Sequence, residues 1–359
     1  MGSTPTSGTT NHGAWLSLVE RSVRDAEVGG SNPLAPTTDR HRLQAEPVFC
    51  ISRHMNKPRF SPLWLAAALL GHTAWGIYPV LARYLQIQAH IPGLTLLTIA
   101  NGFAMLVMVI VVGIRREFHQ LRIRAGWLVA LFAMLRAVTN VLAARYAPAA
   151  QVTLIGLLTP LLVVIMGRVW FQDPAPPNTG VVLTLSLVGA LVMLSGDMQN
   201  PEFWQSGGDS SWVGIALALT SSFMLALYML SVRRTSAYGI SSEATFLLQL
   251  IAVVGTSIPL SYVVGERFDG VASLAPTQWV WLIFFAVFIV IGANILQVYT
   301  LRKLGASLVT AVQAWRLPIS AIAAGFILAE WMHTPTEFIG AALTALSVTW
   351  YLVSQRKAA

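Results

Sequence analysis

Ten hydrophobic stretches fill the chain from Pro62 to Val353, and each is about as long as the roughly 20 residues that a helix needs to cross a bilayer. Only 11% of the residues are charged and the mean hydropathy is +0.64, whereas about a quarter of the residues of a soluble domain are charged. The sequence therefore predicts an all-α, polytopic membrane bundle that has the lipid bilayer as its partner. We expect ten transmembrane helices near residues 62–83, 93–114, 126–145, 149–171, 178–196, 211–232, 242–264, 278–301, 306–328 and 336–354.

Basic residues form four clusters that fall on one side of the membrane if the chain has ten spans. The clusters follow the second, sixth, eighth and tenth spans, at 115–124, 233–234, 302–303 and 356–357. Because cytoplasmic loops collect Lys and Arg, we expect both termini in the cytoplasm. Lys and Arg exceed Asp and Glu by 23 to 15. We assign this excess to orientation in the membrane, so nucleic acid is not an expected partner.

The first 60 residues differ in composition from the rest of the chain. They are rich in Ser, Thr, Gly, Pro and Asn without sustained periodicity, so we expect residues 1–60 to be disordered. Met55 stands just before the first span, and we hypothesise that it is the true start and that residues 1–54 are a start-site error. The one cysteine, Cys50, belongs to this segment, so neither a disulfide framework nor a CxxC metal site is expected.

The second half of the chain resembles a distant copy of the first. A shift of 158 residues places Pro160 on Pro318, and a shift of 150 residues places Tyr78 on Tyr228. An odd number of spans per repeat forces the two halves into opposite orientations, which is typical of carriers that open a central site to either side of a membrane. We therefore expect two inverted five-helix repeats, at 62–196 and 211–354.

Particular residues in both halves carry a resemblance to a known family. They are the first-span run AAALLGHTAWGIYPVLARY, the loops that lead into the spans of Pro160 and Pro318, and, in the second half, Ala329, Glu330 and Gly340. With these features the chain resembles the EamA-type branch of the drug/metabolite transporter superfamily. The resemblance implies a secondary transporter, an exporter rather than an importer, whose spans 1, 3, 4, 6, 8 and 9 line the pathway while spans 5 and 10 lie outside it.

The first half departs from the family pattern after its fourth span. Gln172 stands where the family often has glutamate, and the connection FQDPAPPN is rich in proline. No role is therefore given to a carboxylate at this place. Members of the family carry very different solutes, among them amino acids, nucleotide sugars and drug-like compounds, so the resemblance does not name the substrate.

Three ionisable side chains lie near the middle of predicted spans, where a charge is costly and is associated with transport pathways. Arg136, Arg316 and His72 each stand ten residues into a span, about 15 Å deep at 1.5 Å per residue. One reading is that the arginines only tie helices together, held by amides or by carbonyls freed by Pro160 or Pro318. No carboxylate stands in the middle of a span, so the other reading is that they bind an anion from outside.

The histidine also has two readings. His72 is either a neutral imidazole that is hydrogen-bonded across helices or, if transport is coupled to protons, the candidate for proton coupling.

Further polar and aromatic residues share helix faces with these charges. Asn140 stands one turn from Arg136, Gln313 three residues from Arg316, and Asn294 three residues from Gln297. We expect these amides, with Trp75, Tyr78 and Trp315, to surround a small-molecule substrate. Pro160 and Pro318 are candidates for helix kinks that bend around the central site, although ordinary kinks without function are the alternative.

The sequence thus predicts a transporter of a small organic metabolite with a carboxylate or phosphate group, working by alternating access. The motif GxxxxGK[ST] is absent from the sequence, so no nucleotide or other cofactor is expected. One alternative is a membrane sensor or assembly partner without transport. Another is an intramembrane enzyme, for which Ser221 or Ser222 with His72 is the one dyad that the sequence offers. Whether the chain acts as a homodimer stays open.

Overall fold

The computed structural model describes residues 61–146, 155–172, 175–198, 211–272, 274–329, 331–332 and 334–358, which all belong to the compact unit Pro47–Ala359. The predicted disordered segment 1–60, with Cys50 and Met55, lies outside the described residues, as does Glu330.

The described residues form helices and the turns between them, and no strand occurs among them. The longer helices are α3 (Pro62–Gln88), α4 (Gly93–Ile114), α5 (Arg124–Tyr146), α7 (Thr159–Val169), α8 (Thr179–Met198), α10 (Ser211–Thr235), α11 (Ser242–Val264), α12 (Pro276–Phe284), α13 (Asn294–Leu304), α14 (Ala306–Ala311), α15 (Arg316–Leu328) and α16 (Pro335–Ala358). Short 3-10 turns are η1 (Phe118–Arg122), η3 (Ser236–Tyr238), η4 (Asp269–Val271) and η6 (Gln313–Trp315), and η5 (Phe285–Ala293) is a π-helix.

Eight helical stretches among the described residues are long and apolar enough to cross a membrane. Two shorter apolar helices, Thr159–Val169 and Thr179–Ser195, follow the third of these stretches. The predicted ranges 93–114 and 242–264 coincide with α4 and α11. The prediction of a polytopic, all-helical membrane bundle is therefore confirmed.

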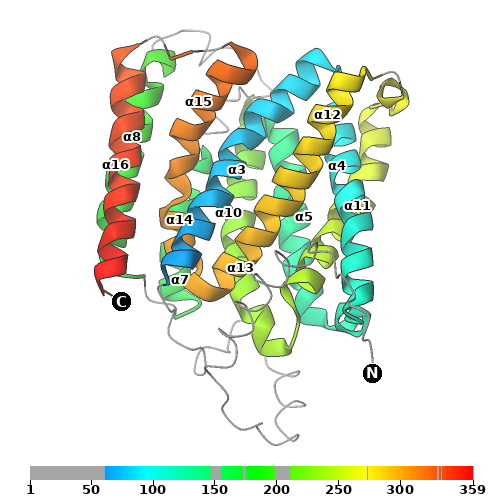
Figure 1. Ribbon diagram of the computed structural model, residues 1–359, viewed down its shortest axis with the longest axis horizontal. Helices are drawn as coiled ribbons and strands as arrows, with labels where there is room; N and C mark the ends of the chain where they lie inside the picture. Colours follow the sequence, from blue (N-terminus) through cyan, green and yellow to red (C-terminus); the bar gives the residue numbers. More distant parts are fainter. Residues whose placement is uncertain are drawn as a thin grey trace, which may run out of the picture. The chain divides into compact units, whose positions relative to one another are not determined.

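The ends of α4, α10 and α13 meet at the end of the bundle where the C-terminus lies (Figure 1). Arg115, which caps α4, pairs with Glu243 at the start of α11, with 2.8 Å between Nη1 and Oε1. Arg302 near the end of α13 donates from Nη2 to the hydroxyl of Thr235, the last residue of α10, over 2.5 Å. The basic clusters after these three helices are therefore gathered at one end of the bundle.

Helices α8 and α16 run side by side at one edge of the bundle (Figure 1). A Cβ atom on Gly340 would overlap backbone atoms of Gly189 and Met193, so the two helices touch through their glycines. The hydroxyls of Ser186 and Ser347 lie 3.0 Å apart. Small residues at a contact of this kind let two helices approach closely in lipid, where packing and hydrogen bonds hold helices together.

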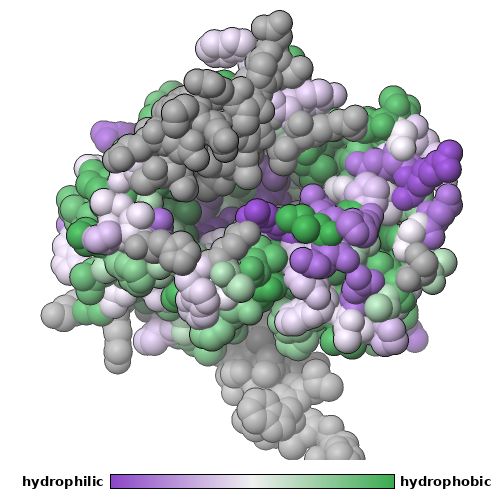
Figure 2. Space-filling model, turned by 90° about the horizontal axis from the view of Figure 1, so that it is seen from above, coloured by the Kyte–Doolittle hydropathy of each residue, from purple (hydrophilic) through white to green (hydrophobic). Residues whose placement is uncertain are grey.

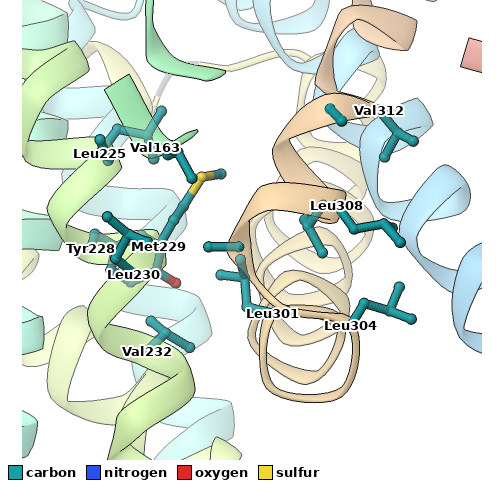
Figure 3. Close-up of a cluster of buried hydrophobic side chains, with 14 of the residues drawn as sticks. Val163, Leu225, Tyr228, Met229, Leu230, Val232, Leu301, Leu304, Leu308 and Val312 are labelled. Carbon is teal, nitrogen blue, oxygen red and sulfur yellow. The ribbon is translucent and has the colours of Figure 1, made fainter. Parts of the chain in front are cut away.

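Aliphatic side chains from α7, α10, α13 and α14 fill one of the two large clusters of buried residues (Figure 3). Met229 and Leu230 of α10 face Leu301 of α13, and Leu304 and Leu308 continue the cluster into α14. The first turns of the ninth predicted span therefore pack against the sixth and eighth.

Two spans are interrupted just ahead of a proline. In the ninth, α14 ends at Ala311, a 3-10 turn follows, and α15 begins with Pro318 as its third residue. In the fourth, a turn at 157–158 precedes α7, whose second residue is Pro160. Proline lacks an amide hydrogen and fits best in the first turn of a helix. Each proline therefore starts a new helical segment rather than bending a continuous one.

The eighth predicted span, 278–301, contains a π-helix that the sequence did not indicate. Residues Phe285–Ala293 adopt this wider winding between α12 and α13. Asn294 follows it directly and donates from Nδ2 to the carbonyl of Val290 over 2.7 Å. Short π-helical turns are frequent at functional sites.

Candidate functional site

The indole of Trp75 lies at the centre of the candidate site. It belongs to α3, and only 8% of the residue is exposed. The guanidinium carbon of Arg136, from α5, lies 5.1 Å from the centre of the ring, and that of Arg316, from α15, lies 5.4 Å from it. The negative face of an aromatic ring attracts cations at such distances. Trp75 therefore holds together two positive charges that would otherwise repel each other.

His72 connects Arg316 to the broken ninth span. Its Nε2 lies 2.7 Å from the carbonyl oxygen of Val309, and its Nδ1 lies 2.9 Å from Nε of Arg316. A carbonyl only accepts and the Arg316 Nε only donates, so Nε2 carries the proton and Nδ1 accepts. Val309 lies in the last turn of α14, where carbonyls lack a partner within the helix. The contacts thus fit the neutral imidazole that links two helices.

The two guanidinium groups keep unused hydrogen-bonding capacity. Nη2 of Arg316 is buried and has no hydrogen-bond partner among the described residues. Arg136 lies over the indole of Trp75 and close to the tyrosines Tyr78 and Tyr228, and within the same part of the chain no hydrogen bond of its guanidinium group is recorded. Among the described residues, no hydrogen bond is recorded from either group to a carbonyl next to Pro160 or Pro318, while Arg316 is linked to His72 on α3.

A cavity adjoins Arg136 and Trp75, with about 610 Å³ of space free of atoms including its open mouth. Aromatic residues, amides and one cation stand among its lining residues, which are Trp75, Tyr78, Leu97, Asn101, Ala133, Arg136, Ala137, Asn140, Val141, Phe246, Gln249, Leu250, Val253, Val290 and Asn294. At the end of the bundle opposite the C-terminus, hydrophilic residues gather near the middle of the face, between hydrophobic ones (Figure 2). A mixture of apolar walls and a few convergent polar groups is typical of a small-molecule site.

The structure brings together only part of the predicted set. Trp75, Tyr78, Arg136, Asn140 and Asn294 line the cavity. Arg316 does not line it but reaches the same indole. The role of these residues in binding stays a prediction.

The other three predicted binding residues lie elsewhere. Gln297 is buried on α13 and is not among the lining residues. Gln313 lines a second, smaller cavity together with Pro160, between α7, α8 and the break in the ninth span. Trp315 donates from Nε1 to the hydroxyl of Thr73 over 3.0 Å.

The sequence analysis missed two amides in the cavity. Asn101 comes from α4 and Gln249 from α11, and Phe246 stands one turn before Gln249. The second and seventh spans therefore contribute to this cavity, although the family resemblance pointed to spans 1, 3, 4, 6, 8 and 9. One feature of the sequence could have indicated these two residues: each amide interrupts an otherwise apolar span. Polar side chains in such spans tend to face other helices.

The contacts of Ser221 and Ser222 bear on the enzyme alternative. Ser221 donates to the carbonyl of Arg136 over 3.0 Å, and Ser222 donates to the carbonyl of Ile155 over 3.2 Å. Both ring nitrogens of His72 are engaged elsewhere. A serine nucleophile needs a hydrogen bond to its base, and the described residues do not form that pair.

Replacing His72 by leucine is expected to lower the stability of the protein. The substitution leaves the Val309 carbonyl and Nε of Arg316 without partners inside the bundle, and two such groups cost about 3 kcal/mol. Thermal unfolding of the purified protein in detergent measures the loss. His72→Gln keeps one donor and one acceptor, so it should recover about half of the difference. Equal stability of the two variants would contradict this network.

Comparisons with known proteins agree with the fold and with the predicted family. Residues 62–195 match the model of the EamA-like transporter family. The search among curated proteins finds no match to this chain. Among solved structures, 28 chains match. One of them, titled "Crystal structure of protein", is 18% identical, covers 81% of this chain and 98% of its own, and superposes with a TM-score of 0.63. That likeness supports the helical fold alone, whereas the family match shows that residues 62–195 are similar to the EamA-like transporter family.

Proposed function

We propose that this membrane transporter is a ten-span secondary carrier of a bacterial inner membrane that exports a small organic solute bearing a carboxylate or phosphate group. The observation that carries the proposal is the pair of guanidinium groups on Trp75, beside a cavity lined by amides and aromatic rings. Arg136 binds the anionic group, Asn140 and Asn294 orient the rest of the solute, and Tyr78 packs against it. Arg316, on the broken ninth span, adds its charge to the positive potential at the site.

Two residues that line the cavity support an inverted repeat. The shift of 158 residues that matches Pro160 with Pro318 also matches Arg136 with Asn294. Arg136 and Asn294 line the same cavity, from the third and eighth predicted spans. The proposed repeats are 62–196 and 211–354, preceded by the N-terminal segment.

A second pair of contacts supports the same symmetry. The shift of 150 residues matches His72 with Ser222. His72 donates to Val309 in the broken span of the second half, and Ser222 donates to Ile155 in the broken span of the first half. Each half therefore uses the same position of its first helix to hold the broken span of the other, as expected where two repeats rock around a shared site.

The basic clusters support the orientation. The clusters that follow α4, α10 and α13 lie at one end of the bundle, with the C-terminus (Figure 1). Because Lys and Arg collect on the cytoplasmic side, we assign this end and both termini to the cytoplasm.

His72 links the site to protons in this proposal. Protonation of Nδ1 removes the acceptor of the Arg316 Nε hydrogen bond and adds a positive charge beside the guanidinium group. Release of Arg316 frees its donors for the anion, so binding of the anion would depend on the protonation of His72. We expect flux to change with pH in the native protein and to depend little on pH in His72→Gln.

Flux measurements with purified protein in liposomes test the function. We expect transport of labelled carboxylates or organic phosphates, and a roughly tenfold loss in Arg316→Ala because one of two charges near the anion is removed. Arg168, exposed in the last turn of α7, gives the matched control, and Arg168→Ala should transport normally. Flux confined to cationic or wholly apolar compounds, unchanged in Arg316→Ala, would overturn the proposal. Binding without flux would support the sensor or assembly role instead.

A further inference from the structure

We propose that the cavity selects organic acids that carry no ammonium group, and that Gln249 recognises the acid group together with Arg136 and Trp75. This inference rests on the proposed function and names the substrate class more closely. It adds Gln249, on the seventh predicted span, as a residue that determines specificity.

Three groups of N–H donors converge on the cavity from three helices. Gln249, on α11, is 5% exposed and lies beside the hydroxyl of Tyr228, and its Nε2 is buried without a partner at full hydrogen-bond geometry among the described residues. The same holds for Nε1 of Trp75 on α3, which is 8% exposed. Arg136 on α5 adds the guanidinium group, and all three residues line the cavity. A buried donor without an acceptor is costly. One carboxylate offers about four acceptor positions and can satisfy all three.

The surroundings disfavour an ammonium group. The ring of Trp75, which would otherwise attract such a cation, already faces the guanidinium groups of Arg136 and Arg316. The lining residues include no aspartate or glutamate. Taking an ammonium group out of water costs several kcal/mol unless a charged partner compensates it. For a solute with both a carboxylate and an ammonium group, binding would require this desolvation of the ammonium group. The ammonium group would also be repelled by Arg136 and Arg316.

Carboxylates with recorded contacts are engaged at the helix ends instead. Glu243 pairs with Arg115 and accepts from the hydroxyl of Tyr299 over 2.7 Å. Glu266 accepts from the amide and the hydroxyl of Thr95 at the start of α4. These contacts keep both carboxylates away from the cavity.

The asparagines on the cavity wall complete the expected selectivity. Asn101 donates from Nδ2 to the carbonyl of Leu97, and Asn294 donates from Nδ2 to that of Val290, each over 2.7 Å. Each bond uses one of the two N–H donors of its amide and leaves the side-chain oxygen as an acceptor. A neutral oxygen suits a hydroxyl group on the solute. We therefore expect hydroxyl groups to be tolerated where an ammonium group is rejected.

Three probes that differ by one group test the inference on the full chain in detergent. They are 3-phenylpropionate, its neutral amide 3-phenylpropanamide, and phenylalanine, which is 3-phenylpropionate with an added ammonium group. The aromatic ring suits the walls formed by Trp75, Tyr78 and Phe246. We expect 3-phenylpropionate to bind at least about tenfold more tightly than either of the other two. Isothermal titration calorimetry or ligand-dependent thermal shift measures the affinities.

Variants of Gln249 test whether this residue determines the preference for acids without an ammonium group. Gln249→Leu removes the donor at similar size and should weaken 3-phenylpropionate roughly tenfold, because a hydrogen bond to a charged group is lost. Gln249→Glu supplies a carboxylate, so it should reject 3-phenylpropionate and gain affinity for phenylalanine. Gln278 lies outside the cavity, where its Nε2 donates to the carbonyl of Gln88, and Gln278→Leu should leave all three affinities unchanged.

The outcomes separate the two proposals. If phenylalanine binds the native protein as tightly as 3-phenylpropionate, or if Gln249→Leu binds 3-phenylpropionate as well as the native protein does, this inference is wrong and anion transport still stands. If the native protein binds 3-phenylpropionate no better than 3-phenylpropanamide, the inference is also wrong. If, in addition, no carboxylate or phosphate compound is transported in liposomes, the proposed function is overturned as well.

Discussion

Replacing Gly340 by alanine is expected to push α16 away from α8 and to destabilise the protein by about 3 kcal/mol. The added Cβ would overlap backbone atoms of Gly189 and Met193, and a backbone cannot move aside as a flexible side chain can. The helices would separate, and the hydrogen bond between Ser186 and Ser347 would lengthen from 3.0 Å. Thermal unfolding in detergent should show a loss of roughly 5 to 10 °C in Tm.

Gly102 provides the matched control for this substitution. It lies in the interior of α4, and a Cβ there would meet nothing within 4 Å. Alanine is a better helix former than glycine, so Gly102→Ala should leave stability unchanged or raise it by up to about 1 kcal/mol. Neither α16 nor α8 contributes to the cavity beside Trp75, so the Gly340→Ala protein that stays folded at low temperature should keep its affinity for anions. Equal stability of the two variants would show that the α8–α16 contact is looser than described.

Hydropathy predicted the described helices closely because length and apolar composition are set locally. The ranges 93–114 and 242–264 match α4 and α11, and the predicted start at 62 matches α3. The π-helix Phe285–Ala293 had no such signal, since the same apolar run is compatible with either winding. Its winding depends on what the helix packs against, and hydropathy carries no information about neighbours.

Residues of the candidate site were predicted from the sequence where burying their side chain in a span costs much free energy. They were missed where that cost is small. Arg136 and Arg316 stood out because a charge in a span is expensive, and both lie against Trp75. Gln249 and Asn101 carry no charge, so their place in the cavity appears only once α11 and α4 are packed beside α5 and α3.

Spacing along a helix was a weaker guide than charge. Gln313 and Arg316 are three residues apart, and residues at this spacing adjoin each other in a helix. The helix is nevertheless interrupted at Gln313–Trp315, and the amide of Gln313 lines the second cavity. Pro318 was the available warning, since a proline marks the first turn of a new segment more often than the interior of a helix.

Replacing Arg136 by glutamine is expected to abolish anion transport, with at least about a 100-fold loss of affinity. Losing a charged partner of a buried anion costs roughly 2 to 5 kcal/mol, and each 1.4 kcal/mol is a factor of ten. The loss should exceed that of Arg316→Ala because Arg136 lines the cavity directly, whereas Arg316 is tied to His72 and reaches the site only through Trp75. Liposome flux and calorimetric titration with 3-phenylpropionate measure the two quantities.

Arg136→Lys distinguishes the role of charge from the role of shape. Lysine keeps the positive charge but not the planar fork that can bind a carboxylate with two parallel hydrogen bonds and lie flat on an indole. We therefore expect Arg136→Lys to recover part of the affinity, and Arg168→Gln, on the exposed end of α7, to keep all of it. Stability should change little in Arg136→Gln, because among the described residues the guanidinium group makes no hydrogen bond that the substitution would break. A variant that unfolds but binds normally when folded would show that Arg136 holds the helices together and that the anion site lies elsewhere.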